Sequence, residues 1–131
     1  MLVKLSFIAV GASFGAIVRF GLVIVGKNLA ELWHFPAGTL IANLIGCLMI
    51  GFLGELGIIK QVFPPNVEAM IFTGFIGSLT TFSTFSHETV KMFNSGSRYH
   101  AFAYMFGSVL AGITMVIVGM AMASYIFKNK Y

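Results

Sequence analysis

Apolar residues fill four stretches of the chain, each long enough to cross a membrane as a helix. A hydrocarbon core of about 30 Å needs roughly 20 helical residues. Short polar connectors separate the stretches, which cover residues 5–25, 35–54, 69–88 and 101–127. We therefore predict an all-α membrane protein whose residues 1–131 form one domain of four transmembrane helices.

The first two stretches have distinctive starts. The first follows Lys4, where a cleaved signal peptide would also begin. Its apolar run exceeds the roughly 7–15 residues of a signal-peptide core and contains Arg19, so we expect it to be retained as the first span. The second stretch has Pro36 near its start, a residue typical of the first position of a helix.

The third stretch is unusually polar where it reads G-F-I-G-S-L-T-T-F-S-T-F-S-H-E over residues 74–88. Phe82 and Phe85 share one face if this segment is helical. Gly74 and Gly77 disfavour a continuous helix, and hydroxyl side chains compete for backbone hydrogen bonds. We predict a broken helix that lines a cavity, with a helix–helix interface rich in small residues as the alternative. Its hydroxyl residues are Ser78, Thr80, Thr81, Ser83, Thr84 and Ser86.

The second and fourth stretches each carry a pair of polar residues four positions apart. Thr39 and Asn43 share one helical face, as do Tyr104 and Ser108. Each pair is either a set of hydrogen-bond donors facing a pathway or a contact that holds two helices together. Small residues at the same spacing predict close helix packing at Gly11/Gly15, Ala42/Gly46 and Gly107/Ala111.

The composition agrees with a protein embedded in lipid. Hydrophobic residues make up 58% of the chain and charged residues 9%, whereas soluble domains carry about 25% charged residues. Cys47 is the single cysteine, so one chain forms no disulfide and no zinc site, and we expect it to pack. The net charge of +4 is too dispersed for a nucleic-acid patch.

Positive charges are balanced between the two sides of the predicted bundle. One side holds Lys4, Lys60, Lys128 and Lys130; the other holds Lys27, Lys91 and Arg98, joined by Arg19 if it lies at that end. The positive-inside rule therefore gives no orientation. Four helices are also few to enclose a path, so we expect two copies to pair in opposite orientations as an antiparallel homodimer.

The ionisable residues bear on the mechanism. Glu31, Glu55 and Glu68 fall in connectors or at span ends, and Glu88 closes the third stretch. A proton-coupled exporter of cations needs a carboxylate in mid-membrane, and this pattern supplies none. Arg19 either faces a cavity or extends to the interface.

The interior chemistry instead fits a small dehydrated anion. Asn, Ser, Thr and Tyr side chains donate hydrogen bonds, and the edges of Phe rings are electropositive. Backbone carbonyls at the break suit a cation. No catalytic triad is evident around His34, His87 or His100, so we expect no enzyme.

Three motifs in order resemble those of the Fluc fluoride channels. Residues 80–85, T-T-F-S-T-F, resemble the family's signature, and residues 38–46, G-T-L-I-A-N-L-I-G, resemble its second-span element. Residues 11–20 resemble its N-terminal glycine-rich motif, with Ala12 and Ser13 where more glycine is typical. The resemblance extends over nearly the whole chain.

This resemblance implies a dual-topology homodimer in the cell (inner) membrane, with two pathways for passive fluoride export. It implies that Phe82, Phe85 and Asn43 contact fluoride, with Thr39 beside Asn43. It also implies contacts from Tyr104 and Ser108, an Arg19 vestibule, and a central structural Na⁺ on the carbonyls of Gly77 and Thr80. Glu88, Thr81, Ser83 and Thr84 would continue a polar track. The expected partners are fluoride, membrane lipid and a second copy of the chain, with no nucleic acid.

Two other functions remain open from the sequence. A small multidrug-type exporter coupled to protons has the same size and dual topology. The other is a membrane scaffold that transports nothing, for which Phe82→Ile or Asn43→Asp would leave ion flux unchanged because there is none.

Overall fold

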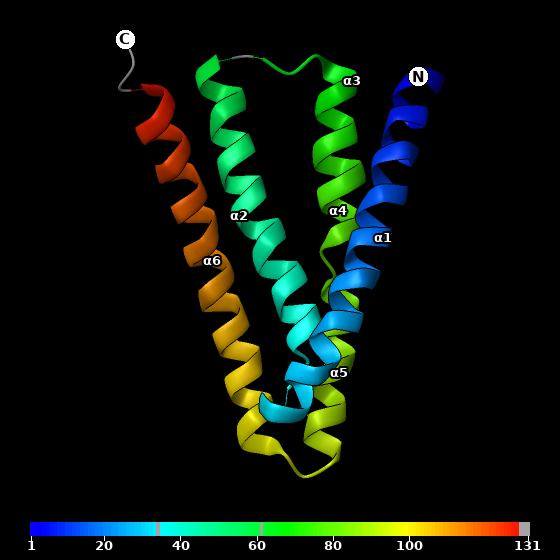
Figure 1. The fold of residues 1–131 in the computed structure, drawn as a ribbon, viewed down its shortest axis with the longest axis vertical. Coiled ribbons are helices and arrows are strands. Elements are labelled where there is room, and N and C mark those ends of the chain that lie inside the picture. The colour runs from blue at the N-terminus through cyan, green and yellow to red at the C-terminus, as the bar shows by residue number, and fades with distance from the viewer. Residues whose placement is uncertain (34, 61, 129–131) are drawn as a thin grey trace.

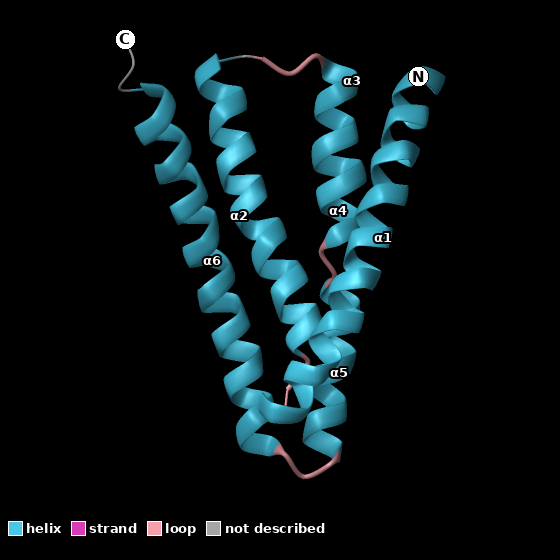
Figure 2. Cartoon of the chain, in the orientation of Figure 1, coloured by secondary structure: helices cyan, strands magenta, loops and turns pink. Residues whose placement is uncertain are grey.

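The computed structural model describes residues 1–33, 35–60 and 62–128, and the segments it describes are helices joined by short loops (Figures 1 and 2). His34 and Lys130 lie outside the described residues, as do the side chains of Glu31 and Lys128. No strand occurs in the described part of the chain. The elements are α1 (Leu2–Trp33), α2 (Ala37–Lys60), α3 (Pro65–Glu68), the π-helix η1 (Ala69–Ile76), α4 (Gly77–Leu79), α5 (Phe82–Asn94) and α6 (Arg98–Lys128).

Four helical spans of the described residues are long and apolar enough to cross a membrane, as predicted. The first, second and fourth spans are α1, α2 and α6, and the third consists of α3, η1, α4 and α5 in sequence. All four extend past the C-terminal end of the predicted stretch. The second begins later, at Ala37, because Pro36 precedes the helix and its carbonyl accepts a bond from the Leu40 amide at 3.2 Å.

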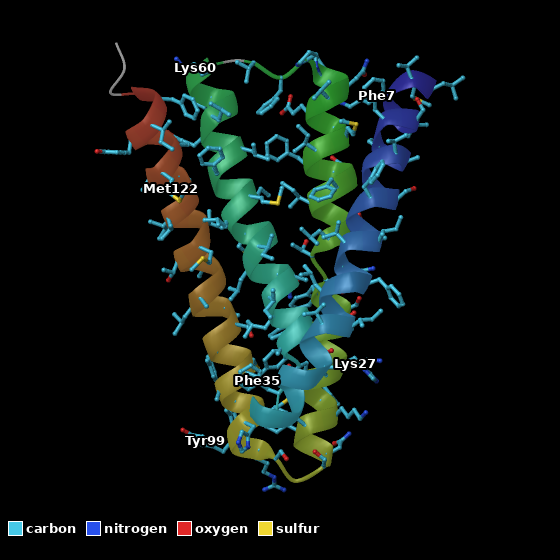
Figure 3. The ribbon with its side chains drawn as sticks, viewed as in Figure 1. Phe7, Lys27, Phe35, Lys60, Tyr99 and Met122 are labelled. Carbon is cyan, nitrogen blue, oxygen red and sulfur yellow. The ribbon has the colours of Figure 1, made fainter. Side chains whose placement is uncertain are left out.

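The helices form an up-and-down bundle with two distinct ends. Both termini and the α2–α3 connector lie at one end, and the α1–α2 and α5–α6 connections lie at the other (Figure 1). In Figure 3, Lys60 lies at the first of these ends and Tyr99 near the second, with Lys27 in the half of the bundle toward Tyr99. α2 packs along α6, whereas α1 packs along η1 and α4. The broken span therefore faces α1 on one side and α2 on the other.

Glycines allow these close helix contacts. A Cβ atom on Gly11 or Gly15 of α1 would overlap a backbone carbonyl oxygen, that of Met70 or of Phe75. The predicted packing role of these two glycines is thus confirmed. Gly107 differs, because a Cβ atom added there meets nothing within 4 Å of the described chain, so its predicted packing role stays a prediction.

The third span is interrupted, as the glycines and hydroxyls predicted. After the short α3 it continues as the π-helix η1, a wide form that is rare and often found at functional sites. After α4 the backbone becomes extended at Thr80 (φ −85°, ψ 153°) and Thr81 (φ −150°, ψ 117°). A helix then restarts at Phe82, where the Thr81 hydroxyl accepts the Thr84 amide as an N-cap.

Few large side chains are fully buried. Among the fully buried side chains of the described chain, the largest are those of Leu79 and Thr39. Leu79 directly precedes the break. Many large apolar side chains are exposed along the helices, including Phe14 and Phe106. A lipid-facing surface needs no polar cover, so this distribution is typical of a membrane bundle.

Candidate functional site

A cavity of about 430 Å³ lies between α2, α6 and the break in the third span. Six residues singled out by the sequence line it, together with apolar side chains: Asn43, Thr80, Thr81, Phe82, Phe85 and Ser108. No charged side chain is among the described residues of its lining. The cavity is therefore an uncharged chamber with a small number of polar groups.

Asn43 holds the extended backbone of the break. Its Oδ1 accepts the Thr81 amide at 2.8 Å, and its Nδ2 donates to the Thr81 carbonyl at 3.3 Å. Without the first bond, the Thr81 amide would lose its partner in a low-dielectric interior, at a cost of several kcal/mol. An amide nitrogen carries two hydrogens, so the Thr81 carbonyl takes only one of them. Asn43 therefore joins α2 to the break, and one N–H of its amide remains beyond the bond to the Thr81 carbonyl.

The two phenylalanines of the broken span lie together on one face. Their ring centroids are 6.0 Å apart with the planes inclined at 44°. Phe85 also packs against Tyr104, with centroids at 5.1 Å. Phe82 is 80% exposed in the single chain. One phenylalanine is thus fixed within the bundle, whereas the other projects from it.

Ser108 brings an unsatisfied hydroxyl to the cavity from α6. Its Oγ is buried, yet it has no hydrogen-bond partner among the described residues. Leaving a buried hydroxyl unpaired costs about 1–3 kcal/mol. The hydrogen-bonding capacity of this hydroxyl is therefore unused within the described chain.

Glu88 lies at the centre of a hydrogen-bonded cluster next to the cavity. The Thr39 hydroxyl donates to Glu88 Oε1 at 2.8 Å, and the Tyr104 hydroxyl donates to Oε2 at 3.0 Å. These bonds connect α2, α5 and α6. The ring of Phe35 stacks on that of Tyr104, with the ring centroids 6.1 Å apart. Phe35 lies toward the Tyr99 end of the bundle in Figure 3. Thr39, Tyr104 and Glu88 are not among the residues that line the cavity.

Two glutamates lie deeper in the spans than their sequence positions suggested. Glu88 is inside α5 instead of closing the third span, because that helix continues to Asn94. Glu55 is inside α2 instead of in a connector, and its Oε1 accepts the Ser124 hydroxyl at 3.0 Å. Both glutamates thus belong to helices of the candidate spans, whereas the absence of a carboxylate in mid-membrane stays a prediction.

The hydroxyls just after the break form the start of α5. Thr81 Oγ1 accepts the Thr84 amide at 3.2 Å and donates to Thr84 Oγ1 at 3.0 Å, and Ser83 Oγ lies 3.4 Å away. Ser83 and Thr84 are exposed in the single chain. The Thr81 hydroxyl thus caps α5, and the Ser83 and Thr84 hydroxyls contact it.

The break also redirects the donors that would pair with two carbonyls. In a continuous helix, the Thr81 amide would pair with the Gly77 carbonyl, and the Thr84 amide with the Thr80 carbonyl. Instead, these amides donate to Asn43 Oδ1 and Thr81 Oγ1. Gly77 is also exposed in the single chain. Oxygen atoms left without their helical donors are suitable ligands for a hard cation such as Na⁺.

Arg19 lies on α1, outside the cavity lining. It follows Gly15, which contacts Phe75 and Ser78, by one helical turn. Its side chain is half-buried. Of the predicted site residues, Arg19 is therefore separate from the group on α2, α5 and α6.

Sequence reasoning missed the apolar part of the lining. Cys47 and Gly112 line the cavity, and each follows a predicted polar residue, Asn43 or Ser108, by four positions. Extending the two polar faces by one helical turn would have found them. The sequence named Ser78 among the hydroxyls of the third stretch but not its partner, and the Ser78 hydroxyl donates to the Ala12 carbonyl of α1 at 2.8 Å.

Comparison with known proteins gives consistent matches over the chain. A family model described as CrcB-like protein, Camphor Resistance (CrcB), matches residues 6–120. A protein of Dehalococcoides mccartyi named fluoride-specific ion channel FluC is 36% identical over 128 residues, which cover 97% of each chain. One of the same name from Chloroflexus aurantiacus is 39% identical over 119 residues, 90% of this chain and 93% of its own. Fluoride-specific ion channel FluC 1 of Bacillus cereus is 40% identical over 131 residues, 97% of this chain and 89% of its own.

Proposed function

This chain belongs to the CrcB family of fluoride channels, and from that membership we propose how fluoride crosses it. It is a multi-pass protein of the cell membrane and a transporter, not an enzyme. Fluoride moves passively through the cavity beside the broken span, which allows the cell to export the anion.

The observation that carries this pathway is the set of groups around the cavity. The Asn43 amide, the Ser108 hydroxyl and the Phe82–Phe85 pair border one chamber whose described lining contains no charged side chain. Fluoride in water is held by hydrogen bonds, and these donors replace that hydration. Ring edges add a weak positive potential without a full charge. The anion is thus stabilised without being trapped, which conduction requires.

A second, antiparallel copy completes the pathway. Phe82 is 80% exposed in one chain, although it is next to the cavity. An antiparallel partner covers this ring and closes the open side of the chamber. Two-fold symmetry then gives two fluoride pathways per dimer.

A structural Na⁺ fits the break on the axis of that dimer. The carbonyls of Gly77 and Thr80 would hold it, since the helical donors of both are directed elsewhere. The ion would neutralise the carbonyl dipoles of two facing breaks and join the two copies. The role of this chain is to keep those oxygens exposed, which Asn43 and the Thr81 cap accomplish.

The remaining polar residues extend the route on either side. Arg19 attracts anions to a vestibule at the protein surface. Thr39, Tyr104 and Glu88 continue the polar path from the cavity toward the Tyr99 end, and Phe85 touches Tyr104 where the two regions meet. The exposed hydroxyls of Ser83 and Thr84 join that path beside Thr81.

Anion efflux from liposomes tests the proposal. Purified protein is reconstituted, valinomycin is added to a K⁺ gradient, and fluoride and chloride release are compared. We expect rapid fluoride efflux with negligible chloride, abolished by Phe82→Ile. Phe14→Ile is the matched control, since Phe14 is an exposed ring on α1 at 63% exposure, away from the cavity. Equal leakage of both anions, or undiminished fluoride efflux in Phe82→Ile, would overturn the proposed pathway.

A further inference from the structure

Gly46 on α2 contacts Thr80 in a way that leaves no room for a side chain. A Cβ atom on residue 46 would lie well under 3.0 Å from Thr80 Cγ2, a separation that real Cβ atoms essentially never show. The other nearby atoms are Thr80 Cβ and Ile76 Cγ2. The Thr80 methyl therefore occupies the space where a side chain at position 46 would begin.

This contact differs from the other tight glycine contacts. At Gly11, Gly51 and Gly119 an added Cβ would overlap backbone atoms of a neighbouring helix, so whole helices would have to separate. At Gly46 it would meet side-chain atoms alone, and the nearest belongs to one methyl group. The contact is therefore specific to the identity of residue 80.

Thr80 cannot rotate its methyl away without losing a hydrogen bond. Its Oγ1 donates to the Ile76 carbonyl at 3.0 Å, and its amide bonds the same oxygen at 3.1 Å. Because the two substituents on Cβ are fixed relative to each other, holding the hydroxyl also holds the methyl. Gly46 thus faces a rigid side chain.

The contact lies at the start of the break. Thr80 is the first extended residue, and the next, Thr81, is bonded at both its amide and its carbonyl by Asn43. Asn43 and Gly46 are three positions apart and lie on neighbouring parts of α2. One helix therefore holds two consecutive residues of the break, one by shape and the other by hydrogen bonds.

We propose that the interlock of Gly46 with the Thr80 methyl is a positioning contact that sets the backbone of the break, and with it the selectivity of the ion pathway. The inference rests on the proposed function for the location of the pathway. Pushing Thr80 away would move its carbonyl, strain the Asn43–Thr81 bonds and shift Phe82, where α5 begins. Gly46 acts through Thr80 and need not touch the ion itself.

A double-mutant cycle tests the interlock. Gly46→Ala introduces the overlap, and Thr80→Ser removes the methyl while it keeps the hydroxyl bond to Ile76. When Thr80 is unchanged, we expect Gly46→Ala to lower fluoride efflux by about tenfold or more, as displacements near 1 Å do at precise sites. When Gly46→Ala is combined with Thr80→Ser, efflux should stay within about twofold of Thr80→Ser alone, because sites in contact are non-additive.

Two further measurements separate positioning from general damage. The ratio of fluoride to chloride efflux should fall in Gly46→Ala and be restored by Thr80→Ser, whereas a simple loss of folded protein lowers both fluxes equally. Gly54→Ala is the matched control on α2, because a Cβ atom there meets nothing within 4 Å; it should leave efflux unchanged and should not lower the melting midpoint, since alanine favours a helix over glycine. Thr80→Val keeps the methyl position and should not rescue Gly46→Ala.

The results of the double-mutant cycle either support or overturn the interlock. Equal losses from Gly46→Ala with and without Thr80→Ser, or no loss when Thr80 is unchanged, overturn the interlock. If Gly46→Ala alone does not fold, a double variant that folds and conducts like Thr80→Ser supports it, and one that does neither overturns it. If the unmodified protein shows no fluoride efflux, the proposed function fails, and the interlock is then tested by the same cycle in the melting midpoint.

Discussion

Replacing Ser108 by alanine should stabilise the protein and impair it at the same time. Ser108 Oγ is buried beside the cavity without a hydrogen-bond partner in the described chain. An unpaired buried hydroxyl costs about 1–3 kcal/mol, and alanine removes that cost while losing only one small atom. We expect the free energy of unfolding to rise by about 1 kcal/mol, which raises the melting midpoint by roughly 2–8 °C.

The effect on conduction should have the opposite sign. A hydrogen bond to a charged group is worth about 1.5–3 kcal/mol, and each 1.4 kcal/mol is roughly tenfold in rate. Removing a donor that stabilises dehydrated fluoride should therefore slow efflux by about 10- to 100-fold. At functional sites, groups that serve activity often lower the stability of the folded protein, and an unsatisfied hydrogen-bond donor is one such group.

Ser78→Ala supplies the comparison. The Ser78 hydroxyl donates to the Ala12 carbonyl at 2.8 Å, so its removal loses a formed bond and should lower stability by about 1 kcal/mol. Thermal unfolding in detergent and efflux from liposomes are measured on both variants. A lower melting midpoint for Ser108→Ala with unchanged fluoride efflux would refute the reasoning, because the hydroxyl would then be a satisfied structural group.

Two further predictions concern the hydrogen bonds on either side of the cavity. Glu88→Gln should lower the free energy of unfolding by about 1–3 kcal/mol, measured by thermal unfolding. The Thr39 and Tyr104 hydroxyls donate to different oxygens of Glu88, and in glutamine one of these oxygens becomes an NH₂ donor. Equal stability would show that these bonds contribute nothing. Thr81→Ala should cost about 1 kcal/mol through the lost cap on the Thr84 amide, whereas Thr81→Ser should retain most of it. Equal melting midpoints for the two Thr81 variants would contradict the capping role.

Much of the fold followed from the sequence because lipid imposes strong constraints. Four apolar stretches predict four helices, since no other open structure satisfies backbone groups in hydrocarbon. The break was also predictable, because Gly77 and the hydroxyls at residues 80 and 81 favour local bonds over the helical ladder. The helix ends were less predictable, since helices continue past the apolar residues: α5 reaches Asn94 although the apolar pattern ended near Glu88.

The candidate site was predictable as a set of residues, but its connections were not. Periodicity placed Asn43 with Thr39 and Tyr104 with Ser108, yet it does not specify that Asn43 bonds Thr81 or that Glu88 joins Thr39 to Tyr104. Those contacts depend on the rotation and depth of one helix relative to another. The π-helix at Ala69–Ile76 changes the rotation and the depth of the third span, and no residue pattern predicted this π-helix.

The position of the carboxylates, more than their number, distinguishes a channel from a proton-coupled exporter. Glu55 and Glu88 both lie within candidate spans, Glu55 close to the end of the second and Glu88 inside α5 of the third, so their number alone does not exclude an exporter. However, each accepts hydroxyl bonds from a neighbouring helix, and neither lines the cavity. An exporter must expose its carboxylate to substrate and proton in turn, which requires those bonds to break in each cycle. A carboxylate held between α2, α5 and α6 instead fixes three helices around a pathway whose described lining is uncharged. Such an arrangement favours passive conduction of an anion through a static site.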